Sequence, residues 1–470
     1  MNIKAIWRYS KIVSRWVSGL ILVLFLLVFA INAFDEELAP ETLALLAVPT
    51  SQLADEDNLY LALMGFSAPA GQSILASGQA KLSAYEKSLA EIRKGRDAAE
   101  VLSTQNPQAL VFSGTIDFLQ PRTSSLWRDV NGHRADVEQM LKSNRELYAR
   151  YLSLHELSGY FDKATPSLYQ EFGYVPKEIR ALFLADLALR LASREPGQQK
   201  QAMLVLDKDV RLWRTMLLGD GSLIVPMMAM ANLQTDYLLI ADMLADTSLD
   251  LAAITAELDR ALVLFDPSDW RIGKPMAYEF RSMAFVFEQT DREWEASMQS
   301  AEHAWWRRAL ARVQKVYYKK NATLNSSAKA LSQSMKMATA EPASMQSVWR
   351  ETEAWQDKNP VFGPGLIYNP IGKILSGVAA PSYADYAFRG YDAAALQRLV
   401  KLGYEIRRQG VPEKDIPQFI EKHPQWATHP VSGAFFKWDD EKGEIALEPV
   451  ATQPKGRRFS IPVWKQGSGA

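Results

Sequence analysis

The sequence predicts a mainly α-helical protein, with an N-terminal transmembrane helix, a large helical bundle or helical stack, and a small C-terminal β-hairpin subdomain. Three observations lead to this fold class. Residues 16–34 carry no charge, the middle of the chain repeats apolar residues at helical spacing, and apolar and polar residues alternate near the C-terminus. With 470 residues, 48% hydrophobic and 23% charged, the chain is long enough to bury a full core.

The first element is the uncharged segment 16–34. A helix of this length spans about 28 Å, close to the ~30 Å hydrocarbon core of a bilayer. Basic residues precede it and acidic residues follow it, so the positive-inside rule places the basic N-terminus, 1–15, in the cytoplasm. We expect a signal-anchor helix in a bacterial inner membrane, with the bulk of the chain periplasmic. The side chains expected to contact lipid are Trp16, Leu20, Leu24, Leu27 and Phe34.

A cleaved signal peptide is the alternative interpretation of the same segment. Ile31 and Ala33 suit a cleavage site after position 33. The apolar run is, however, longer than the ~7–15 residues of a typical signal-peptide core, and the basic region before it is also long. In both interpretations the remaining chain is exported from the cytoplasm. They differ in whether the N-terminal helix remains as a membrane tether.

Composition excludes several classes of function. All four charged residues before position 35 are basic, so residues 35–470 carry 49 basic and 54 acidic side chains, a net charge of −5. This balance gives no reason to expect nucleic acid as a partner. The chain has no cysteine, which excludes disulfides, thiolate metal sites and thiol nucleophiles. The five histidines have no carboxylate at ligand spacing, so we expect no metal and no cofactor.

Residues 35–358 are expected to form the periplasmic helical domain. Connectors of about three residues follow positions 218 and 245, and connectors this short favour antiparallel neighbours. No motif repeats at the ~34-residue period of helical repeats, so a bundle and a helical stack both remain open. Helices are predicted over 55–66, 74–102, 133–161, 177–193, 198–218, 222–245, 249–265, 278–337 with a kink near 325, and 342–356.

The composition changes at Asn359. Residues 359–373 contain three prolines and three glycines, which predicts a loop. Residues 374–466 are expected to form an α+β subdomain docked on the helical domain, and 467–470 form a linker-like tail. This subdomain holds two predicted helices, 383–408 and 412–422; a hairpin of 434–438 and 444–448 with a five-residue loop; and a third alternating segment at 459–463.

Four short strings are found together across most of the exported chain. They are Asn58–Gly65, Asn321–Asn325, Asn369–Lys373, and Pro430–Gly433 leading to Trp438 and Asp439. Together they resemble a group of uncharacterised single-pass envelope proteins of Gram-negative bacteria. The resemblance implies one membrane anchor and a periplasmic body, but no activity and no functional residue.

Ser326 and Lys329 satisfy the S-x-x-K spacing of penicillin-recognising enzymes. On a helix this spacing places the lysine beside the serine, where it is able to accept the hydroxyl proton. No K-T-G motif follows, and the pattern is common by chance. The pair supports an alternative function, a periplasmic cell-wall or ester hydrolase.

The segment Trp305–Lys320 carries two stripes at helical spacing. Trp306, Leu310, Val313 and Tyr317 form an apolar stripe, nearly opposite to a basic stripe of Arg308, Arg312, Lys315 and Lys319. The basic stripe is either a surface for anionic lipid or an acidic partner, or the solvated face of an ordinary core helix.

No complete catalytic set is visible in the sequence. We therefore expect a non-catalytic, membrane-anchored protein that scaffolds or assists an envelope assembly, with the lipid bilayer and an envelope protein as partners. The hydrolase remains the alternative.

Overall fold

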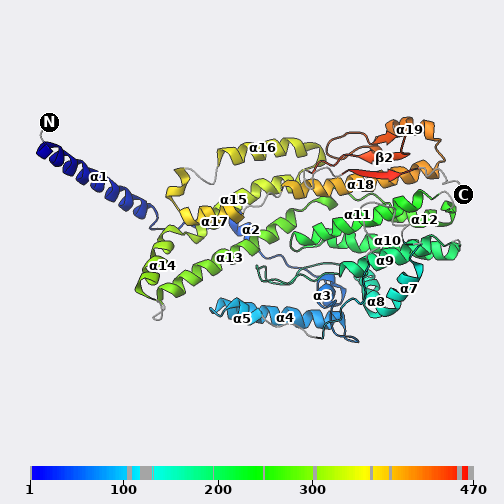
Figure 1. The fold of residues 1–470 in the computed structure, drawn as a ribbon, viewed down its shortest axis with the longest axis horizontal. Helices are drawn as coiled ribbons and strands as arrows, with labels where there is room; N and C mark the ends of the chain where they lie inside the picture. Colours follow the sequence, from blue (N-terminus) through cyan, green and yellow to red (C-terminus); the bar gives the residue numbers. More distant parts are fainter. Residues whose placement is uncertain are drawn as a thin grey trace.

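A computed structural model describes residues 3–102, 108–116, 130, 132–193, 195–246, 249–299, 304–359, 364–379, 384–451 and 458–463. Over these ranges the chain is mainly helical, with a small three-stranded antiparallel sheet near the C-terminus. This confirms the mainly helical character and the small C-terminal sheet of the predicted class. The helices lie side by side in an elongated body, and a single helix, α1, projects from one end (Figure 1).

Two helices of the described chain are long and apolar enough to cross a bilayer: α1 (Ile3–Ile31) and α11 (Ile224–Leu244). They differ in their surroundings. More than half of the apolar stretch of α11 is buried inside the body, whereas that of α1, Val13–Ile31, is not buried at all. The helix α11 is therefore a core helix, and α1 is an apolar N-terminal helix that fits either a membrane anchor or a signal sequence.

The chain after α1 runs along the body as short helices. They are α2 (Pro40–Leu46), η1 (Asp55–Asp57), α3 (Leu59–Met64), α4 (Ile74–Arg93) and α5 (Ala98–Leu102). Every residue of α3 is buried, and α3 packs closely on α4. A Cβ on Gly78 would lie 1.8 Å from the carbonyl oxygen of Leu61, so only glycine allows the two helices to come this close.

The predicted single helix over 133–161 was wrong. The segment forms α7 (Arg134–Ser143), α8 (Arg145–Ser153) and η2 (Leu154–Glu156). The break falls at Asn144, whose buried amide bonds to both the N–H and the carbonyl of Ser113, at 2.8 and 2.9 Å. The helix ends at Asn144 because its side chain bonds to the backbone of Ser113 in a distant segment, and a new helix begins at Arg145.

The core of the body is built from α9 (Lys177–Leu191), α10 (Pro196–Leu218), α11, α12 (Leu251–Ala261) and α18 (Ala384–Arg408). Helix α10 contacts α9, α11 and α12, and α11 contacts α18 (Figure 1). The helices predicted over 177–265 are thus confirmed. Helix α10 packs on α11 across the short connector after position 218, as predicted, whereas α12 packs on α10 rather than on its sequence neighbour α11.

The predicted long helix over 278–337 divides into α13 (Gly273–Gln299), α14 (Trp305–Tyr317) and α15 (Lys320–Thr339). The first break falls between α13 and α14 and the second at Tyr318 and Lys319; neither lies near Asn325, which is inside α15. Tyr318 is buried, and its hydroxyl donates a 2.9 Å hydrogen bond to the Phe287 carbonyl of α13. The polypeptide turns here because Tyr318 anchors it to the neighbouring helix.

After η4 (Pro342–Ser344) and α16 (Met345–Lys358) come η5 (Pro364–Ile367) and α17 (Pro370–Ala379). Helix α17 begins inside the predicted loop 359–373, so that prediction was wrong for its last residues. Pro370 opens α17 at its first position, where a missing N–H costs nothing. Helix α17 lies against α14 and α15.

The predicted hairpin and third strand are confirmed. The strands β1 (Lys437–Asp439), β2 (Glu444–Leu447) and β3 (Phe459–Pro462) pair antiparallel in that order, with Ile445 opposite both Trp438 and Ile461. The sheet packs on α18, near η6 (Glu413–Asp415), α19 (Ile416–Lys422) and α20 (Pro424–Ala427). The expected tail 467–470 lies outside the described residues.

Candidate functional site

Ser326 and Lys329 lie on α15, which packs against α13 and α17. Ser326 is half-buried and Lys329 is exposed. Among the described residues, no hydrogen bond joins the two side chains, and neither lines the two cavities described below. The structure thus places the pair one helical turn apart on α15, away from both of these cavities.

The basic stripe does not form a continuous exposed surface. Arg312 is exposed, while Arg308, Lys315 and Lys319 are half-buried. The Lys315 ammonium forms ion pairs with Asp291 and, at 2.9 Å, with Glu295, both on α13. The opposite, apolar stripe is the more exposed of the two.

The predicted lipid-contacting residues share one environment. Trp16, Leu20, Leu24 and Leu27 are exposed on α1, and Phe34, just after it, is the most exposed of the five. Nothing in the described body covers them. They leave an exposed apolar surface on the Trp16–Ile31 part of α1.

A cluster of polar side chains joins the end of α1 to the body. We call Asn32, Asp35, Thr323, Asn325 and Asn369 the α1 junction. Asn32 is fully buried, donates a 2.7 Å hydrogen bond to the Ile367 carbonyl, and accepts one of 2.7 Å from the N–H of Asn369. The side chain of Asn369 in turn accepts from the Lys319 N–H at 2.8 Å and donates to Thr323 Oγ1 at 2.9 Å.

The conformation of Asn369 explains why asparagine occupies this position. Its φ is +51°, the left-handed region that asparagine tolerates better than other side-chain-bearing residues. Gly372, in the first turn of α17, packs against the same residues: a Cβ on it would lie 1.9 Å from Thr323 Oγ1. The local geometry of η5 and α17 is therefore fitted closely to α15.

Two further residues of the junction hold the segment after α1. The Asp35 carboxylate accepts from the N–H groups of Asn321 and Ala322, at 2.9 and 3.0 Å, in the first turn of α15. A carboxylate is favourable there because helix N-terminal N–H groups lack partners. The Asn325 amide oxygen accepts from the Ala39 N–H and the Thr42 hydroxyl, at 2.9 and 2.8 Å. The segment 32–42 is thus bonded to α15 and to residues 367–369, just before α17.

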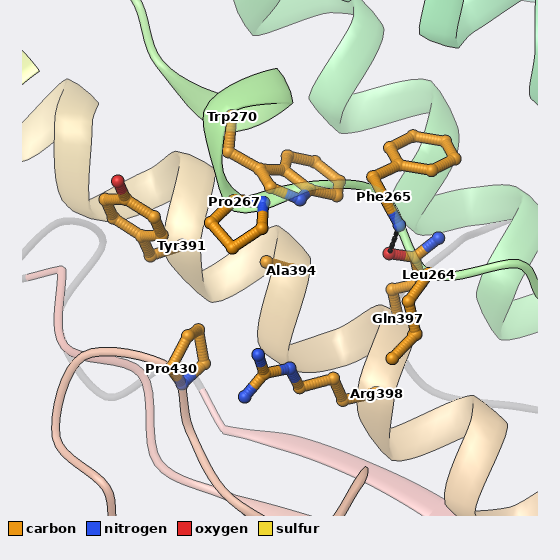
Figure 2. A pocket seen from close by; sticks show the side chains of 9 residues that line it. All are labelled: Leu264, Phe265, Pro267, Trp270, Tyr391, Ala394, Gln397, Arg398 and Pro430. Atoms are coloured by element: carbon orange, nitrogen blue, oxygen red, sulfur yellow. Dashed lines mark hydrogen bonds between the residues drawn. The ribbon is translucent and has the colours of Figure 1, made fainter. Parts of the chain in front are cut away.

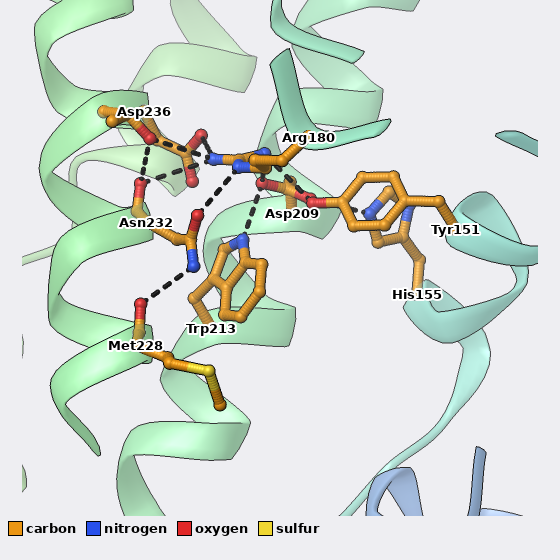
Figure 3. Close-up of polar contacts among 9 residues, drawn as sticks. Tyr151, His155, Arg180, Asp209, Trp213, Met228, Asn232 and Asp236 are labelled. Atoms are coloured by element: carbon orange, nitrogen blue, oxygen red, sulfur yellow. Dashed lines mark hydrogen bonds and ion pairs between the residues drawn. The ribbon is translucent and has the colours of Figure 1, made fainter. Parts of the chain in front are cut away.

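A second polar group, the charge cluster, lies deep in the body (Figure 3). Arg180 of α9 forms ion pairs with Asp209 of α10 and Asp236 of α11, and all three side chains are buried. Tyr151, His155 and Trp213 also bond to Asp209, at 2.6, 2.9 and 3.0 Å. The cluster connects three core helices and α8.

The two carboxylates of the charge cluster titrate differently. Burial would raise the pKa of Asp209, but Arg180 and the bonds from His155 and Tyr151 outweigh it and lower the pKa to about 2. Burial raises the pKa of Asp236 well above its ordinary value, because Arg180 alone does not compensate for it. The Arg180 guanidinium thus lies between two buried carboxylates whose pKa values shift in opposite directions, an arrangement suited to a structural role.

Two small cavities lie at the contact of α18 with the body. The first, about 30 Å³, is lined by Phe265, Trp270, Tyr391 and Arg398 among others, and the Gln397 amide at its wall accepts from the Phe265 N–H at 3.1 Å (Figure 2). The second, about 120 Å³, lies between α11 and α18. Ligand sites for drug-sized molecules measure about 300–1,000 Å³, so these cavities suit water better than a substrate.

The carboxylate beside the second cavity is already occupied. Asp392 bonds to His429 Nε2 at 3.0 Å and accepts from the N–H groups of Val450 and Ala451 at 2.8 and 3.0 Å. His429 Nδ1 accepts from the Val431 N–H at 3.1 Å. These bonds fix the loops around the sheet to α18.

A scan of protein-family models, a search of curated proteins and a search of solved structures find no match to this chain. The geometry of the molecule is therefore the basis of the functional proposal. Sequence reasoning missed the α1 junction, although three of its members, Thr323, Asn325 and Asn369, lie in the quoted strings Asn321–Asn325 and Asn369–Lys373. An asparagine directly before a proline, followed by a glycine, was the available signal of a constrained turn.

Proposed function

We propose that this protein is a membrane-anchored helical protein whose periplasmic body scaffolds or assists an envelope assembly without catalysing a reaction itself. The observation that carries the proposal is the burial of Asn32 in the α1 junction. Asn32 directly follows the apolar helix α1, and its polar side chain is packed inside the body.

The junction favours a retained anchor over a cleaved signal peptide. Cleavage after Ala33 would remove Asn32 and leave the Asn369 N–H and the Ile367 carbonyl without their partner. Each buried polar group left unpaired costs about 1–3 kcal/mol. A sequence that discards residues 1–33 gains nothing from such bonds, whereas one that keeps α1 gains a fixed orientation between its helix and its body.

The exposure of α1 supports lipid as its surroundings. Its apolar side chains cover the helix on all sides and meet no part of the described body. Exposure of such an apolar surface to water is unfavourable, and the hydrocarbon core of a bilayer removes it from water. With residues 1–15 cytoplasmic, the body lies in the periplasm of a bacterial cell. An export-dependent reporter fused after Trp464 is expected to be active, and activity of a cytoplasm-dependent reporter there contradicts this topology.

A protein partner is supported by exposed apolar side chains far along the sequence from α1. Leu168 and Tyr174 are 70% and 63% exposed in the segment before α9. Exposed apolar groups that lie close together are typical of interaction surfaces. The small cavities described above offer no comparable site for a substrate.

Site-specific photo-cross-linking tests this function. A photoreactive residue at Leu168 or Tyr174 of the membrane-bound chain is expected to capture a defined envelope protein, which mass spectrometry identifies. The same residue at Glu441, exposed in the β1–β2 loop, serves as the control. Equal products at all three positions contradict a specific partner surface. Covalent labelling by a fluorophosphonate or β-lactam probe that disappears in Ser326→Ala contradicts the non-catalytic assignment.

A further inference from the structure

The amphipathic helix α14 is turned with its apolar stripe away from the body. Trp306, Leu310 and Val313 are 50%, 50% and 52% exposed, while Ala311, on the other side of the helix, is buried. Helix α14 packs on α13 through its polar side. This is the reverse of an ordinary surface helix, which buries its apolar face.

Specific contacts fix this orientation. Lys315 is held by Asp291 and Glu295 of α13, so its side of the helix faces the body. At the C-terminal end, Tyr318 is buried, bonds to the Phe287 carbonyl and packs edge-on against Trp294 at 4.8 Å between ring centres. A rotation of α14 that buried the apolar stripe would break these contacts.

The apolar stripe lies at the end of the body from which α1 leaves, and α14 runs crosswise to α1 (Figure 1). Helix α17 contacts α14 and carries exposed Ile374, and Ile367 of η5 is also exposed. If α1 spans a bilayer, a helix crosswise to it at this end lies parallel to the membrane surface. The exposed apolar groups therefore adjoin the point where α1 enters lipid.

We propose that α14 is an interfacial helix that lies on the outer surface of the membrane spanned by α1, with its apolar stripe inserted among the phospholipids. This inference rests on the proposed anchor. Its partner is a lipid surface, and with α1 it gives the body two attachments to the bilayer and hence a fixed tilt.

The composition around the stripe favours lipid over a protein partner. Trp305 and Trp306 stand together at the start of α14, and tryptophan is the side chain most typical of the membrane–water interface. Arg307 lies over the Trp306 ring at 5.2 Å, so a cation borders the apolar stripe at the level expected for phosphate headgroups. Apolar, aromatic and basic groups thus follow the order of an interfacial helix.

Single cysteine labels test this arrangement, because the natural chain has none. Leu24→Cys, Val313→Cys and Val263→Cys are labelled with the environment-sensitive dye NBD in the full chain and reconstituted into phosphatidylethanolamine–phosphatidylglycerol vesicles. Val263 is the matched control, a valine with 55% exposure against 52% for Val313, located after α12. Lipids with a nitroxide near the headgroup or near the acyl-chain end then quench dyes at the corresponding depth.

We expect a blue-shifted emission at Val313 that is quenched more by the shallow nitroxide than by the deep one, since interfacial helices lie about 5–10 Å into the headgroup boundary. The Leu24 label, mid-span, is quenched more by the deep nitroxide, and the Val263 label by neither. Quenching at Leu24 without quenching at Val313 overturns the interfacial helix and leaves the anchor standing. Quenching at neither position overturns both. Shielding of Val313 in native membranes but not in pure lipid shows a protein partner and also overturns the proposal.

Discussion

The backbone N–H of Asn369 donates a 2.7 Å hydrogen bond to Oδ1 of Asn32, across 337 positions of sequence. Both residues are buried, and the bond connects the last turn of an apolar N-terminal helix to a turn that no local pattern would place beside it. Through this bond and its neighbours, α1 has a defined direction relative to the body. A tether with a fixed direction suits a protein that presents its body to other components at a set distance from a membrane.

Asn32→Ala is expected to destabilise the region around the α1 junction by about 1–3 kcal/mol, because it leaves the buried Asn369 N–H and Ile367 carbonyl unpaired. Thermal unfolding of the purified chain in one detergent measures the change. Asn359→Ala is the control, since Asn359 is exposed and bonds only locally, to the Trp355 carbonyl. Equal melting temperatures for the two variants would show that the junction contributes nothing.

Gly372→Ala is expected to loosen α17 from α15. The added methyl would lie 1.9 Å from Thr323 Oγ1 and 2.4 Å from the Asn369 amide, so one of the helices must move. Faster amide hydrogen exchange in 367–376, with a lower melting temperature, reports the change. Gly197→Ala has open space around its Cβ and lies in the first turn of α10, so it is expected to be neutral or slightly stabilising. Unchanged exchange in Gly372→Ala would disprove the close fit.

Arg180→Met is expected to destabilise the body by about 3–5 kcal/mol, because it leaves the ionised Asp209 buried without its cation. Chemical denaturation measures this loss. A double variant with Asp209→Asn is expected to recover part of it, since it removes the uncompensated charge. The control Arg211→Met removes an exposed cation of the same helix, α10, and its partner Asp207 keeps an ion pair with Arg260, so this variant is expected to cost about 0–1 kcal/mol. A mild effect at Arg180 would show that the charge cluster is not needed for stability.

Asp162 is expected to make stability depend on pH. Burial raises its pKa to about 6 from the ordinary 3.8, so between these values the folded chain keeps a proton that the unfolded chain releases. The free energy of unfolding therefore falls as the pH rises from about 4 to about 6. Asp162→Asn lacks this titration, so its free energy of unfolding does not fall in this way. Relative to the natural chain, its stability therefore increases by about 2–3 kcal/mol as the pH rises from about 4 to about 7.5. Denaturation curves of the natural chain and of Asp162→Asn at about pH 4 and about pH 7.5 measure this gain. If the stability difference between the two chains is the same at both pH values, the raised pKa of Asp162 is refuted.

The sequence predicted what depends on local periodicity. The α9–α12 helices follow from apolar spacing and short connectors, and the sheet follows from alternation around Trp438, Ile445 and Ile461. It did not predict the breaks at Asn144 and Tyr318, because each depends on a partner far along the chain, Ser113 for one and Phe287 for the other.

The candidate sites show the same limit. Periodicity separated the apolar and basic stripes of α14 but contained no information on which one faces the body. That choice depends on Asp291 and Glu295, which meet Lys315 only in the folded chain. The α1 junction likewise depends on contacts between residues that are hundreds of positions apart. In the C-terminal subdomain, Leu396 and Leu399 of the predicted helix are buried, whereas Phe435 of the predicted hairpin is 47% exposed, because alternation alone does not show which face of a short segment the body covers.

The central claim is that α1 stays attached and holds the body to the membrane. Membranes from cells that make the chain are washed with alkaline carbonate, and the mass of the protein in the pellet and in the supernatant is determined. We predict that the protein is in the pellet and retains residues 1–33, and with them Asn32, the partner of Asn369. A soluble protein that begins at Phe34 would contradict it, because the junction would then be lost during export.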